Sequence, residues 1–398
     1  MLMGLTIIFT LYIALRLYIS VMHIGYIDSQ KEHPVLMSAS EYLVAARYAI
    51  AKERVAMVGA MLEYLLFFVW VGGGLAFLER HFWLDGTLNG AFLGVMAFMV
   101  VNVIVTLPLG IYQTFGIDSR FGFNKSTVGL FVKDTLISWV IGTVAIYGIV
   151  AVVWLIIESS SLWWLYTFTF LLGVIVLLNI LFPVVRALFF DKLSPIVDET
   201  LKSRLESLFA ASGFNAQGLY VSDASRRDSR LNAYFAGLGR QKRVVLYDTL
   251  IAKLSVDEIV AVLGHELGHF RHGDIYKNIA LTGGLLFVVL AVFGNLPLEL
   301  FSSMGIDVST GATMVLFLLL SNVLFFALMP IMGRVSRAHE FAADAYGSQL
   351  GGQVHLVSAL KKLVIENRAF PRAHPLYNFF YATHPPVLER FKAMGVEA

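Results

Sequence analysis

The chain contains no cysteine in its 398 residues. Disulfide bonds and thiolate metal ligands are therefore excluded, and any zinc site must use histidine and carboxylate side chains. Charged residues are also scarce, at 15% of the chain, whereas hydrophobic residues make up 58%. A soluble enzyme of this composition would expose too much apolar surface to water. An ordinary soluble domain is thus excluded as well.

The net charge is small, with 30 lysine and arginine residues against 28 acidic ones, or +2 at pH 7. No basic stripe with interleaved aromatic residues is present, so the sequence predicts no nucleic-acid partner. The sequence shows no internal repeat and no low-complexity tract, and it does not indicate an oligomeric state.

What the chain has instead is a set of long runs without charge. Each of these runs is about 20 residues or longer, enough to cross a hydrocarbon core of about 30 Å as a helix. They are residues 91–111, 135–157, 162–182, 278–298 and 312–332. Two further runs, 2–20 and 57–78, contain one charge each, Arg16 and Glu63. The sequence therefore predicts about seven membrane spans.

Basic residues alternate between the loops that join these spans. The loops after the first, third, fifth and seventh spans are rich in lysine and arginine, for example Lys31, Arg120 and Lys125. The loop after the second span has only Arg80, and those after the fourth and sixth have none. By the positive-inside rule, we expect the N-terminus outside and the C-terminus in the cytoplasm. The first span lacks a basic flank and a cleavage site, which favours a retained helix.

The strongest motif is His265-Glu266-Leu267-Gly268-His269. A capping box, Ser255 to Glu258, precedes it and predicts a helix that Gly273 ends. On a helix, His265 and His269 lie on one face, so both imidazoles can reach one metal ion. Glu266 can then act as general base toward a water on that metal.

Two polar stretches, about 186–275 and about 334–398, are expected to fold outside the bilayer. The first predicts an amphipathic helix at 198–211 and short strands at 218–221 and 243–246. Between them lies Asn232-Ala233-Tyr234-Phe235. In zinc peptidases an edge strand beside the metal holds an extended substrate through backbone hydrogen bonds. We interpret Asn232–Phe235 as that strand, with a simple hairpin as the alternative.

A catalytic zinc ion keeps three protein ligands and one open position. Residues that could supply the third ligand are His272, His339, Glu340, Asp344, His374 and His384. Glu340 and Asp344 are four apart on a predicted helix, so one could bind zinc while the other holds a ligand imidazole. Two spans separate them from His269, which returns the chain to the same side. A solvated acidic face is the alternative for this pair.

Four segments together resemble the type I CaaX prenyl protease family of integral-membrane zinc metalloproteases. They are NAYFAGLG at 232–239, HELGH at 265–269, SRAHEFAADAYG at 336–347 and THPPVLERF at 383–391. Weaker similarity lies at 46–55 and 121–127, so the resemblance covers nearly the whole chain.

The resemblance implies a role for each matching residue. Glu340 would be the third zinc ligand, with Asp344 supporting the site, and Asn232 to Phe235 would bind the substrate. His384 and Arg390 would stabilise the reacting carbonyl or hold the substrate C-terminus. The family's helices enclose a large chamber with zinc at its cytoplasmic end. Its substrates end in CaaX sequences with a prenylated cysteine, and cleavage releases the last three residues.

We therefore predict an α-helical polytopic membrane protein, with about seven transmembrane helices enclosing a chamber. A small α+β zincin-like metalloprotease domain would lie on the cytoplasmic side. The expected division is 1–185 for spans one to five, 186–275 for the protease domain, 276–333 for spans six and seven, and 334–398 for its C-terminal part. The compact chain favours a bacterial inner membrane, with the endoplasmic reticulum membrane expected in a eukaryote.

The predicted function is removal of the C-terminal tripeptide from prenylated CaaX peptides or proteins. One catalytic Zn²⁺ would be bound, and Glu266, His384 and Asp344 would serve catalysis. One alternative is a quality-control metalloprotease that cuts misfolded or non-prenylated membrane substrates. Another is a sensor or scaffold with a structural zinc site, although such sites normally use four side chains, often cysteines. A seven-span transporter would leave the HELGH motif unexplained.

Overall fold

The structure is a computed structural model, and it describes residues 1–214, 218–236 and 243–397. In this part of the chain, seven helices are long and apolar enough to cross a membrane, which confirms the predicted number of spans. The helices are α1 (Leu2–Gln30), α2 (Ala39–Val69), α4 (Leu88–Ile111), α5 (Val128–Ser159), α6 (Trp163–Phe189), α10 (Asp274–Phe293) and α12 (Thr310–Gly351).

Two of the spans continue through irregular helix. α2 runs on through the π-helical η1 (Trp70–Gly74), α3 (Leu75–Leu78) and η2 (Glu79–Trp83), and α4 runs on through η3 (Tyr112–Asp118). Gly73 has a φ of 145° inside η1, a value that glycine adopts without steric cost. The second span therefore bends at the glycine run 72–74 rather than ending there.

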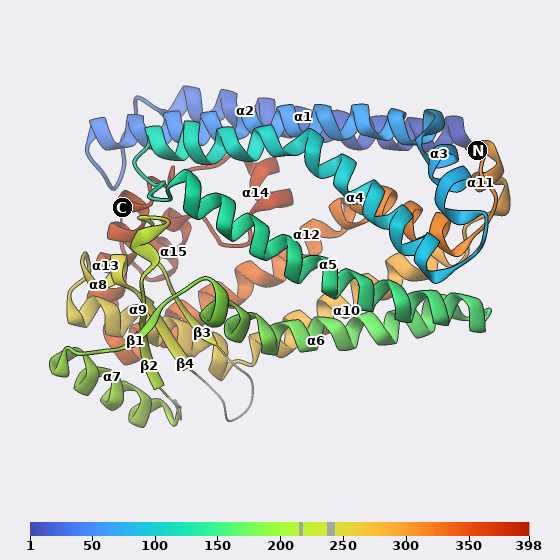
Figure 1. The fold of residues 1–398 in the computed structure, drawn as a ribbon. Coiled ribbons are helices and arrows are strands. Elements are labelled where there is room, and N and C mark those ends of the chain that lie inside the picture. The colour runs from blue at the N-terminus through green and yellow to red at the C-terminus, as the bar shows by residue number, and fades with distance from the viewer. Residues whose placement is uncertain (215–217, 237–242, 398) are drawn as a thin grey trace.

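The helices run between two ends of the molecule (Figure 1). The sheet end carries the strands and the C-terminus, and the far end carries α3, the N-terminus and α11 (Leu298–Ser303). The loops with Lys31 and with Arg120 and Lys125 follow α1 and η3, whose C-terminal ends lie at the sheet end. The loops that the charge pattern grouped together thus share one end of the molecule.

The sixth span ends before the uncharged run does. The uncharged run extends to 298, but α10 ends at Phe293. Gly294 and Asn295 form a turn there, and Pro297 precedes the short α11. Hydropathy alone does not register such helix-breaking residues, because they carry no charge.

The polar segment between α6 and α10 forms a four-stranded sheet in the order β1-β2-β4-β3. The strands are β1 (Leu193–Pro195), β2 (Gly218–Ser222), β3 (Ala233–Ala236) and β4 (Arg243–Tyr247). β2 pairs with β4 in parallel, whereas β1 pairs with β2 and β3 with β4 in antiparallel fashion. β3 therefore lies at an edge of the sheet, as expected for Asn232–Phe235; residues 237–239 of that motif lie outside the described residues.

Helices complete the polar part at the sheet end. α7 (Glu199–Ser212) begins at its N-cap Asp198 and confirms the predicted amphipathic helix. α9 (Val256–Arg271) has the expected capping box between Ser255 and Glu258 and is followed by Gly273 at a φ of 67°. The remaining helices are η4 (Ala224–Arg226), α8 (Asp248–Ile251), α13 (Gln353–Glu366), α14 (Pro375–Tyr381) and α15 (Val387–Ala393).

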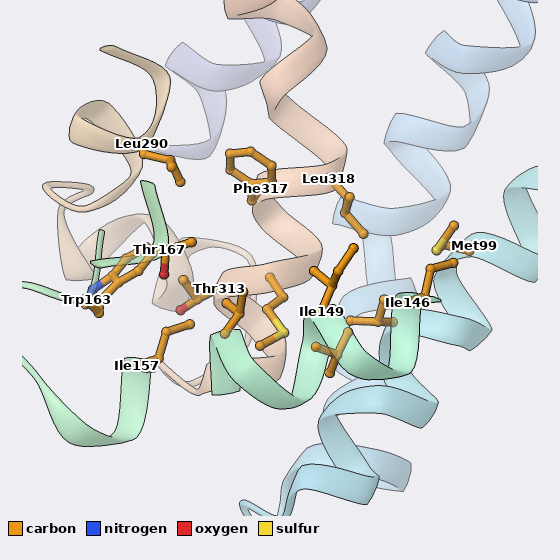
Figure 2. Close-up of a pocket in the computed structure, with 14 residues that line it drawn as sticks. Met99, Ile146, Ile149, Ile157, Trp163, Thr167, Leu290, Thr313, Phe317 and Leu318 are labelled. Carbon is orange, nitrogen blue, oxygen red and sulfur yellow. The ribbon is translucent and has the colours of Figure 1, made fainter. Parts of the chain in front are cut away.

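An apolar cavity of about 240 Å³ lies among α4, α5, α6, α10 and α12 (Figure 2). Its lining is almost wholly hydrocarbon, and Thr167 is a buried hydroxyl among these residues. Phe317, which also lines the cavity, lies about six helical turns, or roughly 35 Å, before Glu340 on α12. The cavity is thus remote from the histidines of α9.

Candidate metal centre

His265 and His269 project from α9 toward α12. Their ring centroids are 4.8 Å apart, and each Nδ1 contacts a carboxylate: Asp344 Oδ1 at 2.9 Å for His265 and Asp274 Oδ2 at 3.0 Å for His269. Both Nε2 atoms therefore face Glu340, at 3.6 Å from Oε2 for His265 and 3.3 Å from Oε1 for His269. Carboxylates on both Nδ1 atoms fix the tautomer that leaves Nε2 free to bind a metal.

The cluster fits a single metal ion. One ligand atom from each of His265, His269 and Glu340 lies within 4.8 Å of the other two. Glu340 is only 4% exposed, and among the described residues its Oε2 makes no hydrogen bond, although the Arg390 guanidinium lies 3.4 Å away. A carboxylate buried in this way is stabilised by nearby cations, and a metal ion between Glu340 and the two histidines would add one. Two imidazoles and one carboxylate form a typical three-residue set for a catalytic zinc ion.

A seam of small residues brings α9 and α12 close enough for this arrangement. Gly264 and Gly268 of α9 face Gly347 and Ala343 of α12. A Cβ on Gly268 would lie 2.8 Å from Ala343 Cα, and one on Gly347 would lie 2.7 Å from His265 N. Small residues spaced by four let the two backbones approach. The close packing of the two helices therefore allows the side chain of Glu340 to reach both histidines.

Burial and nearby charge shift the pKa values of two residues of α9, Glu266 and His269. Burial raises the pKa of the Glu266 carboxyl, and the neighbouring histidines only partly oppose this effect. Burial would lower the pKa of His269, but hydrogen bonds to Glu340 and Asp274 outweigh it and raise that pKa to about 9. A carboxyl with a raised pKa is suited to accept and return a proton near neutral pH.

Arg390 is a buried partner of the carboxylates. Its Nε and Nη2 donate to Asp344 at 2.7 and 2.5 Å, and its Nη1 lies 3.4 Å from Glu340 Oε2. The side chain is 10% exposed. We expected Arg390 among substrate-binding residues, and the structure shows that its guanidinium also holds the carboxylate that orients His265. A two-pronged pair of this kind fixes the position of Asp344.

His384 lies on the open side of the cluster. Its Nε2 is 3.4 Å from Glu340 Oε1, and its side chain is 66% exposed. His272 caps the C-terminus of α9 and His374 is the N-cap of α14, so neither joins the cluster. His339 faces Asp274 instead, with its Nε2 3.5 Å from Oδ1.

Asp274 is the residue that the sequence analysis missed. It is 3% exposed and contacts His269 Nδ1 and Lys277 Nζ, each at 3.0 Å. The signal in the sequence was available: an acidic residue directly follows Gly273, where the chain turns back past His269. Helical spacing does not select Asp274, because it stands five residues beyond His269.

A groove of about 490 Å³ runs beside the cluster. Glu266, His384 and Arg390 line it together with Asn232 and Ala233. The other two residues of the predicted substrate strand do not line it. Tyr234 packs under the Arg186 guanidinium, 5.4 Å from the ring centroid, and Phe235 packs on Phe214. The structure thus brings the first half of the predicted strand to the site.

Two family models match the chain. One is peptidase family M48, over residues 195–397, and the other is the CAAX prenyl protease N-terminal region with five membrane helices, over residues 30–192. The CAAX prenyl protease 1 homolog of Arabidopsis thaliana is 35% identical, covering 75% of this chain and 72% of that protein. CAAX prenyl protease 1 of Saccharomyces cerevisiae is 33% identical, covering 76% of this chain and 71% of that protein.

Similarity extends to a bacterial relative and to a solved structure. The metalloprotease YhfN of Bacillus subtilis is 28% identical, covering 92% of this chain and 88% of that protein. The crystal structure of S. mikatae Ste24p matches with a TM-score of 0.89 at 26% identity, covering 98% of this chain and 97% of that one. With the residues of a metal-dependent peptidase assembled at the end of seven spans, the chain belongs to peptidase family M48 and is a multi-pass membrane metalloprotease.

Proposed function

We propose that the protein is a zinc endopeptidase that removes the C-terminal tripeptide from prenylated CaaX peptides or proteins. The observation that carries this proposal is the groove that joins Glu266 and His384 to the free edge of β3. An edge strand beside a hydrolytic centre binds an extended peptide through its main chain. The relatives named CAAX prenyl proteases support the substrate class.

In the proposed mechanism, His265, His269 and Glu340 would hold Zn²⁺. Bound there, zinc would supply Lewis acidity toward the scissile carbonyl and lower the pKa of water. Glu266 accepts the proton of the attacking water and returns it to the leaving amine, a task that its raised pKa suits. His384, exposed at the groove, donates to the developing oxyanion, where one such donor typically contributes about 3 kcal/mol.

The supporting residues hold this geometry. Asp344 orients His265, and Arg390 in turn holds Asp344 through two hydrogen bonds. Asn232 and Ala233 present the start of the substrate strand, with Tyr234 and Phe235 continuing it away from the groove. The guanidinium of Arg390 therefore positions Asp344, and Arg390 also lines the groove that would receive the substrate.

The loop charges favour the sheet end as the cytoplasmic side, and hence an N-terminus outside. We infer that the groove lies at the cytoplasmic surface of the membrane, and the compactness of the 398-residue chain favours a bacterial inner membrane. A prenylated or otherwise membrane-anchored peptide would reach it from the bilayer.

The test compares prenylated and unprenylated CaaX peptides with the purified protein, with and without a zinc chelator. We expect chelator-sensitive release of a tripeptide from the prenylated peptide, and a slower reaction or none from the other. Equal cleavage of both peptides, or of unfolded membrane proteins at arbitrary sites, would favour the quality-control function instead. Tripeptide release that persists after complete zinc removal would contradict the proposed chemistry.

A further inference from the structure

The free edge of β3 has a defined register. Tyr247 N donates to Asn232 O at 3.1 Å, so Asn232 faces β4. Because N–H and C=O groups alternate between the two sides of a strand, Leu231, Ala233 and Phe235 direct theirs away from β4. Ala233 N–H contacts the neighbouring Asn232 Oδ1 at 2.9 Å, a local contact that a substrate carbonyl can replace.

At Leu231 this edge is already occupied. Leu231 N donates to Asn367 Oδ1 at 2.8 Å, and Asn367 Nδ2 donates to Leu231 O at 3.2 Å. The side-chain amide of Asn367 thus makes both hydrogen bonds that a residue of a neighbouring strand would make. A peptide that pairs with Ala233 cannot continue its pairing at Leu231.

Asn367 is held firmly in this position. It caps the C-terminus of α13, with its N–H donating to Leu363 O and Ile365 O. The next residue, Arg368, has a φ of 46°, a left-handed conformation that is unusual for a residue with a side chain. Its guanidinium lies over the Phe123 ring, 5.6 Å from the centroid. Unfavoured backbone conformations persist where the surroundings fix them, often at functional sites.

Asn367 and Leu231 line the same groove as Glu266 and His384. Residues 369–373 line it as well, just beyond Asn367 along the chain. A substrate that pairs with β3 must therefore end, or leave the edge, where it meets Asn367. Because the proposed function releases the C-terminal fragment, that end is the C-terminus, and the substrate runs antiparallel to β3.

We propose that Asn367 is a positioning residue that sets the length of the released fragment. This inference rests on the proposed function. The first residue after the scissile bond pairs with Ala233, which lines the groove together with Glu266. The third residue after it then meets the side-chain amide of Asn367, which holds the N–H and C=O of Leu231, so the pairing ends there. A longer fragment has no edge to follow, so three residues are released.

The experiment uses two prenylated peptides, with three and with five residues after the modified cysteine, and follows their products by mass spectrometry. The quantity measured is the ratio of kcat/KM for the short peptide to that for the long one. In Asn367→Ala we expect this ratio to fall by about tenfold, the effect of two ordinary backbone hydrogen bonds. Asn367→Asp, which keeps the acceptor for Leu231 N–H and loses the donor, should give an intermediate ratio.

Asn378→Ala is the matched control. Asn378 also lines the groove, but among the described residues its side chain makes no hydrogen bond to β3. Its ratio should equal that of the wild type. A fall of kcat/KM for both peptides by the same factor in both Asn367 variants, at unchanged zinc content, would overturn the inference alone. Failure of the wild type to cleave either peptide would overturn the proposed function and this inference with it.

Discussion

Replacement of Asp274 by asparagine is the most direct test of how the metal centre is held. The carboxylate contacts His269 through Oδ2 and Lys277 through Oδ1. Asparagine has one oxygen, so it cannot accept from both. If its amide nitrogen faces His269, the imidazole takes the tautomer with the proton on Nε2 and no longer binds metal. If the nitrogen faces Lys277 instead, the amide N–H and the Lys277 ammonium are both donors and oppose each other, at a residue that is only 3% exposed in the wild type.

Loss of such an orienting partner typically weakens zinc binding by 10- to 100-fold, or about 1.4 to 2.7 kcal/mol. We expect this change in the zinc Kd of Asp274→Asn, measured by competition with a chromogenic chelator. Lys277→Met serves as the control, because it contacts the same carboxylate from a half-exposed position and leaves the bond to His269 intact. A Kd of Asp274→Asn within about threefold of the wild-type value would refute the role given to Asp274.

Three further predictions concern Glu266, the close packing of α9 against α12, and Glu258. Glu266→Gln should abolish peptide hydrolysis while zinc content by atomic absorption stays at the wild-type level; turnover at the wild-type rate would mean that another group is the base. Gly347→Ala should lower the melting temperature and the zinc content, since its Cβ would meet the backbone of His265, whereas Gly284→Ala, with open space around it, should change neither. Burial alone would raise the pKa of Glu258, but hydrogen bonds from Lys362, Ser358 and Ser255 N–H lower it. Its stabilisation is therefore present above pH 4.5 and is lost as pH falls through the lowered value, so Glu258→Gln should flatten the acid limb of melting temperature against pH.

The parts of the fold that depend on local pattern could be predicted from the sequence. Length and absence of charge indicate a span whatever its neighbours are, and seven spans were found. The capping box at Ser255 and the glycine at 273 bound α9 correctly, because both act within one helical turn. The spacing of His265 and His269 likewise brings the two rings together through local geometry alone.

The parts that depend on contacts between distant segments could not be predicted in this way. The residues favoured Glu340 among several possible third ligands, and the family resemblance then selected it. Asn367 meets Leu231 across more than a hundred residues, and no spacing along the chain connects them. The hydrogen bond from Arg390 to Asp344 could not be predicted either, because it forms only once α15 packs beside α12.

The continuity of α12 has a consequence for biosynthesis. One helix crosses the bilayer and carries Glu340 and Asp344 beyond it, whereas both histidines lie on α9, ahead of the last two spans. A ribosome therefore completes the histidine pair while the third ligand is still unsynthesised. The nascent chain cannot assemble the three-residue set until its seventh helix has been inserted. Insertion of the final span is thus the step that completes the ligand set, and a chain that stops before it holds two of the three residues.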